Sequence, residues 1–165
     1  MEKKEYMAKA FEILAQLSDV KDELSTKLCK LSETDFSDKG FEEKAEQKTV
    51  EEELAQVAAL SYQVLDKIGK AVGSGKAQDG FFDSSIERMR LAEKYWEGET
   101  KKLDTFIETE KDSGTLTDDE KEAYVYKYPR SKGPEMALSK AIEIAEKIDK
   151  DEKIENQDDP DGGKN

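Results

Sequence analysis

The fold is decided by residues 2–32, EKKEYMAKAFEILAQLSDVKDELSTKLCKLS, a segment that contains neither Gly nor Pro. Within it, mostly apolar residues recur at alternating intervals of three and four, with one polar interruption, at Met7, Ala10, Leu14, Leu17, Lys21, Leu24, Leu28 and Leu31. Because this spacing places side chains along one side of an α-helix, the segment predicts a long amphipathic helix.

The same spacing returns after a connecting segment at residues 32–40. Its positions are Val50, Leu54, Val57, Ser61, Val64, Ile68 and Ala71. Gly73 and Gly75 then end the second helix. Two such stripes in succession predict an antiparallel helical hairpin. The polar residues Lys21 and Ser61 are expected to fix the register of the two helices, and the alternative is that this edge is less buried and receives a partner helix.

The second half of the chain predicts two more long helices with a short one between them. The third helix runs to about Asp112, and its stripe is less regular, with Ile86, Met89, Trp96, Leu103 and Ile107. Thr117 and Glu120 are spaced to cap a short helix that ends near Tyr124. Pro129 and Pro134 are expected to prevent a continuous helix. Pro134 suits the first turn of a last helix, whose apolar residues are Leu138, Ala141, Ile142, Ala145 and Ile148.

These segments predict an all-α fold, an elongated antiparallel four-helix bundle with a short extra helix before the last long helix. Helices of about 22 to 31 residues would make the bundle roughly 35 to 45 Å long. Residues 1–156 are expected to form a single domain and residues 157–165 a disordered acidic tail. The alternative is a long helical hairpin with the second half of the chain packed on one end.

The charge balance narrows the range of partners. The chain carries 40 Asp and Glu against 27 Lys and Arg, a formal charge of -13. This charge repels nucleic-acid phosphates and anionic membranes and favours basic proteins, so we expect neither direct nucleic-acid binding nor membrane association. With no apolar run near the roughly 18 residues of a membrane span and no apolar signal segment, a cytoplasmic protein is expected, while signal-less secretion or a mature exported form stays open.

Missing side chains argue against an enzyme. The sequence contains no histidine, which is the usual acid-base group near neutral pH and the commonest transition-metal ligand. Cys29 is the sole cysteine, which excludes an intramolecular disulfide. We therefore expect a non-enzymatic protein with no catalytic residue, no cofactor and no metal site.

Two loops resemble ligand-binding motifs only in part. Asp35, Ser37, Gly40 and Glu46 occupy four positions of a calcium loop, but Lys39 stands where an oxygen ligand belongs, so a turn is favoured. Residues 69–77 resemble a phosphate-binding loop with the wrong glycine spacing and a helix in place of the preceding strand. We expect a helix end with a flexible turn there, and Phe36 and Phe41 to close the end of the bundle.

One short segment is the candidate partner-binding site. It contains Tyr124, Tyr126, Tyr128, Arg130 and Lys132 in a predicted loop of an otherwise acidic chain. Tyr and Arg are enriched at interaction hot spots because they are large, semi-rigid and able to make both apolar and polar contacts. The alternative is that the tyrosines close the open end of the bundle.

These observations predict a non-enzymatic helical bundle that binds another protein, as an adaptor, accessory factor or inhibitor. A first alternative is an acidic nucleic-acid mimic, of the kind that phages encode, which inhibits a basic host enzyme. A second is a self-associating structural or secreted helical protein, since nothing in the sequence rules out a homo-oligomer. The sequence assigns the chain to no family.

Overall fold

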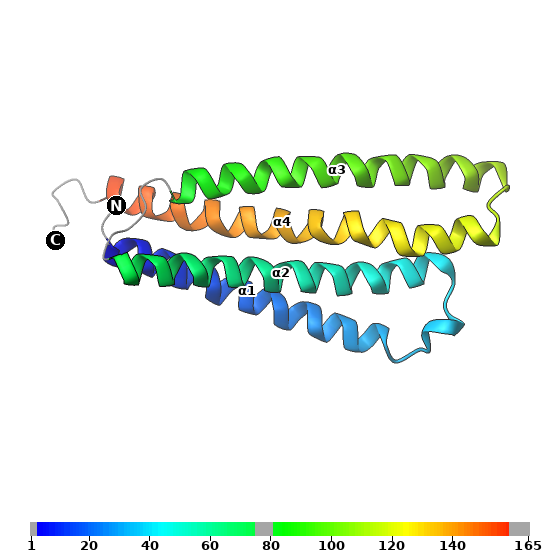
Figure 1. Ribbon diagram of the computed structural model, residues 1–165, viewed down its shortest axis with the longest axis horizontal. Coiled ribbons are helices and arrows are strands. Elements are labelled where there is room, and N and C mark those ends of the chain that lie inside the picture. Colours follow the sequence, from blue (N-terminus) through cyan, green and yellow to red (C-terminus); the bar gives the residue numbers. More distant parts are fainter. Residues whose placement is uncertain (1–2, 75–80, 159–165) are drawn as a thin grey trace.

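The computed structural model describes residues 3–74 and 81–158, which form four long helices. Their bounds are Lys3–Leu31 for α1, Phe41–Ser74 for α2, Phe81–Ser113 for α3 and Asp118–Asp158 for α4, with a turn of 3₁₀ helix, η1, at Phe36–Asp38. The helices run alternately in opposite directions along one long axis, and the described ranges contain no strand (Figure 1). The predicted all-α antiparallel four-helix bundle is confirmed.

The bundle consists of two hairpins that meet through helices running in the same direction. α1 packs against α2 and α3 packs against α4, and α4 also packs extensively against α2 and less extensively against α1. In the described part of the chain, the consecutive helices α2 and α3 do not pack extensively against each other. Across the molecule the helices therefore follow the order α3, α4, α2, α1 (Figure 1).

The predicted short extra helix does not exist as a separate element, because α4 is continuous through Pro129 and Pro134. Each proline removes one backbone hydrogen bond and costs the helix about 3 kcal/mol in isolation. Both prolines are buried in the contact between α4 and its neighbours. A helix that packs on two sides has enough buried surface to offset these losses, so tertiary packing overrides the local preference.

The start of α4 agrees with the sequence. The Glu120 backbone N–H donates a hydrogen bond to the Thr117 hydroxyl at 3.2 Å, and the Thr117 N–H donates to the Glu120 carboxylate at 3.3 Å. This reciprocal pair is the predicted capping box. At the other end α4 continues to Asp158, so the first two residues of the predicted tail are helical. The rest of that tail, residues 159–165, lies outside the described residues.

Gly133 sets the distance between α2 and α4. A Cβ atom at Gly133 would lie 2.5 Å from the Glu52 Cβ and 2.9 Å from the Glu53 backbone nitrogen. Real side chains do not tolerate such distances, so only glycine allows the two backbones to approach this closely. The close contact of the two hairpins thus depends on one residue.

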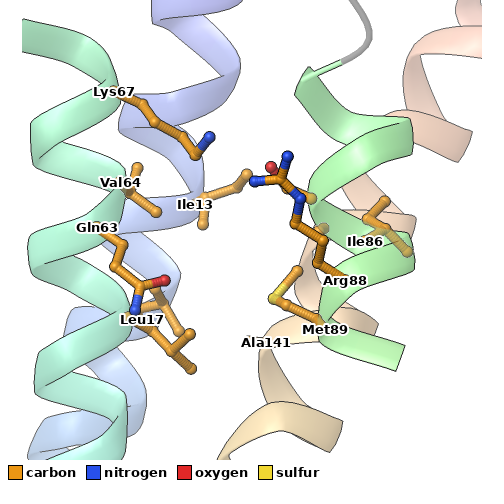
Figure 2. A pocket seen from close by; sticks show the side chains of 12 residues that line it. Ile13, Leu17, Gln63, Val64, Lys67, Ile86, Arg88, Met89 and Ala141 are labelled. Carbon is orange, nitrogen blue, oxygen red and sulfur yellow. The ribbon is translucent and has the colours of Figure 1, made fainter. Parts of the chain in front are cut away.

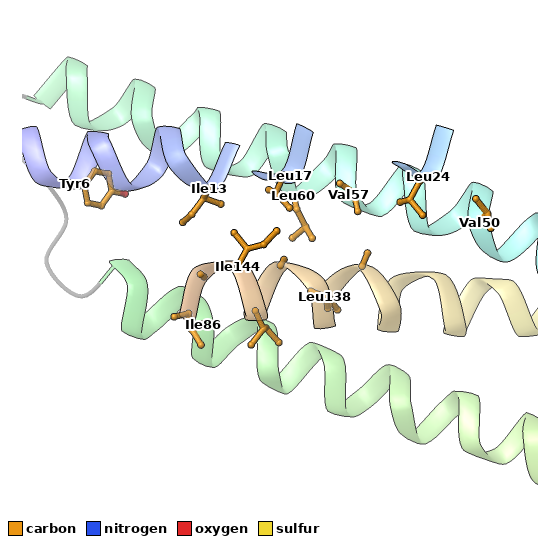
Figure 3. Packing of buried hydrophobic residues seen from close by; sticks show 14 of the residues in the cluster. Tyr6, Ile13, Leu17, Leu24, Val50, Val57, Leu60, Ile86, Leu138 and Ile144 are labelled. Atoms are coloured by element: carbon orange, nitrogen blue, oxygen red, sulfur yellow. The ribbon is translucent and has the colours of Figure 1, made fainter. Parts of the chain in front are cut away.

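The core runs along the shared faces of the helices (Figure 3). Leu17 and Val57, both from the predicted stripes, are almost completely buried. Tyr6, Ile13 and Leu60 are buried as well, although they lie outside those stripes. The buried faces are wider than one coiled-coil stripe because α1 contacts both α2 and α4, and α2 contacts both α1 and α4.

Candidate functional site

The five residues of the predicted partner-binding site lie on α4, and the helix distributes them over two faces. Tyr124, Tyr128 and Lys132 are four residues apart and share one face, where they are half-buried. Tyr126 and Arg130 are offset by two residues, lie on another face and are exposed. The expectation of a loop was wrong, and the five side chains do not form one surface.

The first face lines a groove between α2, α3 and α4, near the α3–α4 connection, with a volume of about 400 Å³. We call it the polar groove; its lining includes Glu53, Asp104, Tyr124, Tyr128 and Lys132. The rings of Tyr124 and Tyr128 stack at 4.7 Å between centroids, and Phe41 meets Tyr124 edge-on at 6.0 Å. These contacts support the alternative interpretation, in which the tyrosines close this end of the bundle.

Burial shifts the ionisation of the groups in the polar groove. Burial raises the pKa of Asp104, and the nearby Lys132 opposes this shift. The pKa of Tyr124 and that of Tyr128 are also raised, first by burial and then by neighbouring groups that include the Asp104 carboxylate. Burial lowers the pKa of Lys132, but the hydrogen bond and charge of Glu135 outweigh it, so the net shift is upward.

Several charged groups of the polar groove are paired within the bundle. Lys132 contacts the Glu135 carboxylate at 2.9 Å on the same helix. Lys140 of α4 donates a hydrogen bond to Glu53 of α2, whose side chain is 1% exposed. A carboxylate this deeply buried needs such a partner, because an unpaired buried charge is strongly destabilising. The polar groove therefore joins α2 to α4.

The face of α4 that carries Tyr126 lies near the connection between α1 and α2. The Lys48 ammonium lies 5.2 Å from the ring centroids of both Phe36 and Tyr126, and Lys121 lies 5.7 Å from that of Phe41. Such cation–π contacts are worth about 0.5 to 1 kcal/mol at exposed sites. Phe36 and Phe41 are half-buried beside these contacts, and their closing of the end of the bundle stays a prediction.

The two loops that resemble ligand-binding motifs have structural roles where they are described. Lys39 is buried and donates a hydrogen bond from its ammonium group to the Leu31 carbonyl at the end of α1. The described residues contain no cluster of three or more His, Cys, Asp and Glu side chains that could hold a metal ion. Residues 69–74 form the end of α2, and residues 75–77 lie outside the described ranges.

An open apolar surface lies on the α1–α2 hairpin. Phe11 of α1 is 52% exposed, and Tyr62, Leu65 and Val72 of α2 are 73%, 48% and 53% exposed. They belong to two stripes with intervals of three and four, which we call together the outer face. Its residues are Ala8, Phe11, Ala15 and Ser18 on α1, and Ala58, Tyr62, Leu65, Gly69 and Val72 on α2.

Helix geometry shows that both stripes point away from α4. Successive residues of an α-helix are turned by about 100°. Lys9 lies 3.7 Å from Asp149 of α4, and Phe11, two residues further on, is turned about 160° away from it. Glu53 contacts α4 through Lys140, and Tyr62 and Leu65 are turned from Glu53 by about 180° and 120°. The outer face is thus the solvent side of the hairpin.

An acidic row borders the outer face along α1. Glu5, Glu12, Asp19 and Glu23 are all exposed and lie three or four residues from Ala8, Ala15 or each other, so they form one continuous edge of the helix. The α2 side carries the exposed pair of Asp66 and Lys70 at 3.0 Å. The outer face therefore combines an apolar centre with a negatively charged border on its α1 side.

Exposed apolar residues also occur on α3, where Leu91, Tyr95 and Phe106 are 65%, 60% and 44% exposed. Lys102 interrupts this row, so it forms no continuous apolar stripe. Sequence reasoning missed the outer face because it followed the buried stripe of each helix. The signal was a second stripe on α2, from Ala58 to Val72, with the same intervals as the first.

Comparisons of the chain with protein-family models, with curated proteins and with solved structures gave no match. Within the described ranges, no helix is long and apolar enough to cross a membrane. Inferences about function therefore depend on the surfaces described above.

Proposed function

We propose that this chain is a non-enzymatic protein-binding bundle whose outer face binds an amphipathic helix of a partner protein. The observation that carries the proposal is the exposure of Phe11, Tyr62, Leu65 and Val72 in two neighbouring helical stripes. Single exposed apolar residues are ordinary on protein surfaces, whereas a continuous apolar strip indicates an interaction site. The accessory, adaptor or inhibitory role follows from binding a partner without chemistry of its own.

The shape of the outer face suits a helix. Two antiparallel helices leave a shallow groove between them, and the apolar intervals of three and four on both sides match the side-chain ridges of a third helix. The half-buried polar residues Lys21 and Ser61 belong to the buried stripes of the same two helices. The Ser61 hydroxyl donates to the Val57 carbonyl at 3.0 Å, so it does not need a partner inside the core.

The border predicts the charge of the partner helix. The acidic row of Glu5, Glu12, Asp19 and Glu23 favours a helix with Lys or Arg beside its apolar face. The overall charge of -13 would also speed the association with a basic partner. The partner is therefore a basic amphipathic helix, bound by apolar contacts and oriented by charge.

A synthetic helical peptide tests this proposal directly. The probe is a peptide of about 18 residues with Leu at intervals of three and four and Lys on both flanks, and its control has the same composition in scrambled order. Titration calorimetry should show binding of the patterned peptide only. Leu65→Glu should weaken that binding at least tenfold, whereas Leu91→Glu on α3 should leave it unchanged. Equal binding by both variants would contradict the proposal.

Salt dependence separates the proposal from its alternatives. Apolar docking should lose only part of its affinity at high salt, whereas a nucleic-acid mimic that binds through charge alone should lose nearly all of it. If the outer face instead joins two copies of the chain, sedimentation should show a dimer that Leu65→Glu converts to a monomer. Loss of nearly all affinity at high salt would favour the nucleic-acid mimic instead of the partner helix. A dimer that Leu65→Glu converts to a monomer would favour self-association.

A further inference from the structure

A second opening between the helices lies at the end of the bundle opposite the polar groove. We call this end the apolar end. The opening has a volume of about 120 Å³, and α4 lines it with Ala141 and Ala145, which are one helical turn apart and both 3% exposed. Because these side chains are small, and because α2 and α3 do not pack extensively against each other in the described ranges, α4 leaves room between its neighbours.

The lining of this opening is mostly apolar. Buried side chains of the other three helices line it, namely Ile13, Leu17, Leu60 and Ile86. Val64 of α2 and Met89 of α3 are partly buried beside them (Figure 2). The polar lining residues are Gln63, Lys67, Ser85 and Arg88. A guest would therefore contact mainly hydrocarbon, which favours an uncharged molecule because burying a charge among apolar groups is costly.

Two neighbouring side chains of α3 favour an aromatic guest over a saturated one. Figure 2 shows the Arg88 side chain extending from α3 into the space between α2 and α3, with the Met89 thioether close by. A guanidinium group stacks on the face of an aromatic ring, and a thioether sulfur makes favourable contacts at the edge of one. A saturated ring offers neither interaction.

We propose that the opening at the apolar end binds an uncharged aromatic molecule of about one ring, with the Arg88 guanidinium against its face. An apolar cavity of about 150 Å³ in another protein binds benzene, which sets the size of the guest. A ring in this place adds dispersion contacts to Leu17, Val64 and Met89.

This site is independent of the outer face. The opening lies between α2 and α3, whereas the outer face is on the side of the α1–α2 hairpin that points away from α4. A bound ring therefore leaves Phe11 and Leu65 accessible. Binding of the partner helix and binding of the ring can each fail without affecting the other.

Titration of the full-length chain with benzene tests the site. An aromatic ring shifts the NMR signals of protons close to it, and Met89 lines the opening whereas Met136 lines the polar groove. Benzene should therefore shift the Met89 methyl signal in a saturable manner and leave the Met136 methyl signal in place. Cyclohexane has a ring of the same number of carbon atoms without an aromatic face, so it should bind about threefold more weakly.

Two variants test the polar and the apolar part of the site. Arg88→Gln should weaken benzene binding about threefold and remove the preference over cyclohexane. The matched control is Arg90→Gln, because Arg90 also lies on α3 but pairs with Glu146 of α4, and it should retain wild-type affinity. Ala145→Leu adds three carbon atoms to the lining and should abolish benzene binding, with folding checked by the circular dichroism of the helices.

Three results would overturn the proposal. The first is the absence of a saturable shift of the Met89 signal in the unaltered chain. The second is equal affinity for benzene and cyclohexane, or equal losses in Arg88→Gln and Arg90→Gln. The third is wild-type benzene binding by a folded Ala145→Leu variant, because the ring would then lie elsewhere. The Met89 signal and the arginine variants decide the matter if Ala145→Leu does not fold.

Discussion

The two ends of the bundle differ in the side chains that line the space between α2 and α3. At both ends a space remains between α2 and α3 above α4. In the polar groove, stacked tyrosines and the pair of Glu53 and Lys140 occupy that space. At the other end, the apolar end, the opening lined by Leu17, Val64 and Met89 has a volume of about 120 Å³, against about 400 Å³ for the polar groove. The comparison teaches that apolar packing leaves a smaller space between these helices than polar pairing does.

The largest expected effect comes from placing a charge at the apolar end. Leu17 is 1% exposed, so Leu17→Asp buries an unpaired carboxylate and should destabilise the bundle by more than about 4 kcal/mol. Leu65→Glu on the outer face should change stability by less than about 0.5 kcal/mol. Urea denaturation followed by circular dichroism measures both. Similar losses for the two variants would mean that the outer face is part of the core.

A smaller effect separates the two faces of α4 at the polar end. Tyr128 is half-buried and stacks on Tyr124, so Tyr128→Ala should cost about 2 kcal/mol. Tyr126 is 50% exposed, and its ring makes a cation–π contact with Lys48. Tyr126→Ala should therefore lower the free energy of unfolding by less than about 1 kcal/mol. Thermal unfolding of the two variants measures this difference. A larger loss for Tyr126 would contradict the assignment of faces.

The smallest effect concerns the pH dependence of the polar groove. Burial raises the pKa of Asp104, so the folded state binds a proton more tightly there than the unfolded chain does. The stabilisation from this proton is complete below the ordinary Asp pKa and is lost as pH rises through the raised value. Asp104→Asn should therefore stabilise the bundle slightly at neutral pH and leave it unchanged in acid. Urea midpoints at about pH 7 and pH 3 measure the change, and a loss of stability at neutral pH would show that the ionised carboxylate is favourable.

The sequence predicted the elements with strong local signals. The stripes through Leu17 and Val57 predicted α1 and α2, and Thr117 with Glu120 predicted the start of α4. Pro129 and Pro134 led to a wrong prediction. Their destabilisation of an isolated helix can be read from the sequence, whereas the burial that offsets it arises only when α4 packs against its neighbours. Because the two prolines were expected to break the helix, the segment from Tyr124 to Lys132 was wrongly predicted to be a loop.

The candidate sites were harder to predict than the fold. Helical spacing alone separates Tyr124 from Tyr126, but only once the segment is known to be helical. The opening at the apolar end is lined by residues of all four helices, and α2 and α3 do not pack extensively against each other in the described ranges, so no local sequence pattern predicts it. The outer face was visible as a second stripe, and its exposure depends on which side of the hairpin α4 covers.

The glycine contact between α2 and α4 has a consequence for the order of folding. Each hairpin forms from neighbouring segments, whereas Lys140 and Glu53 meet across a separation of 87 residues. Closing so long a loop costs more entropy than forming either hairpin, so the hairpins should form first and their docking should limit the rate. Because the hairpins meet where Gly133 faces Glu52, a single methyl group added at Gly133 would slow the docking of the two hairpins.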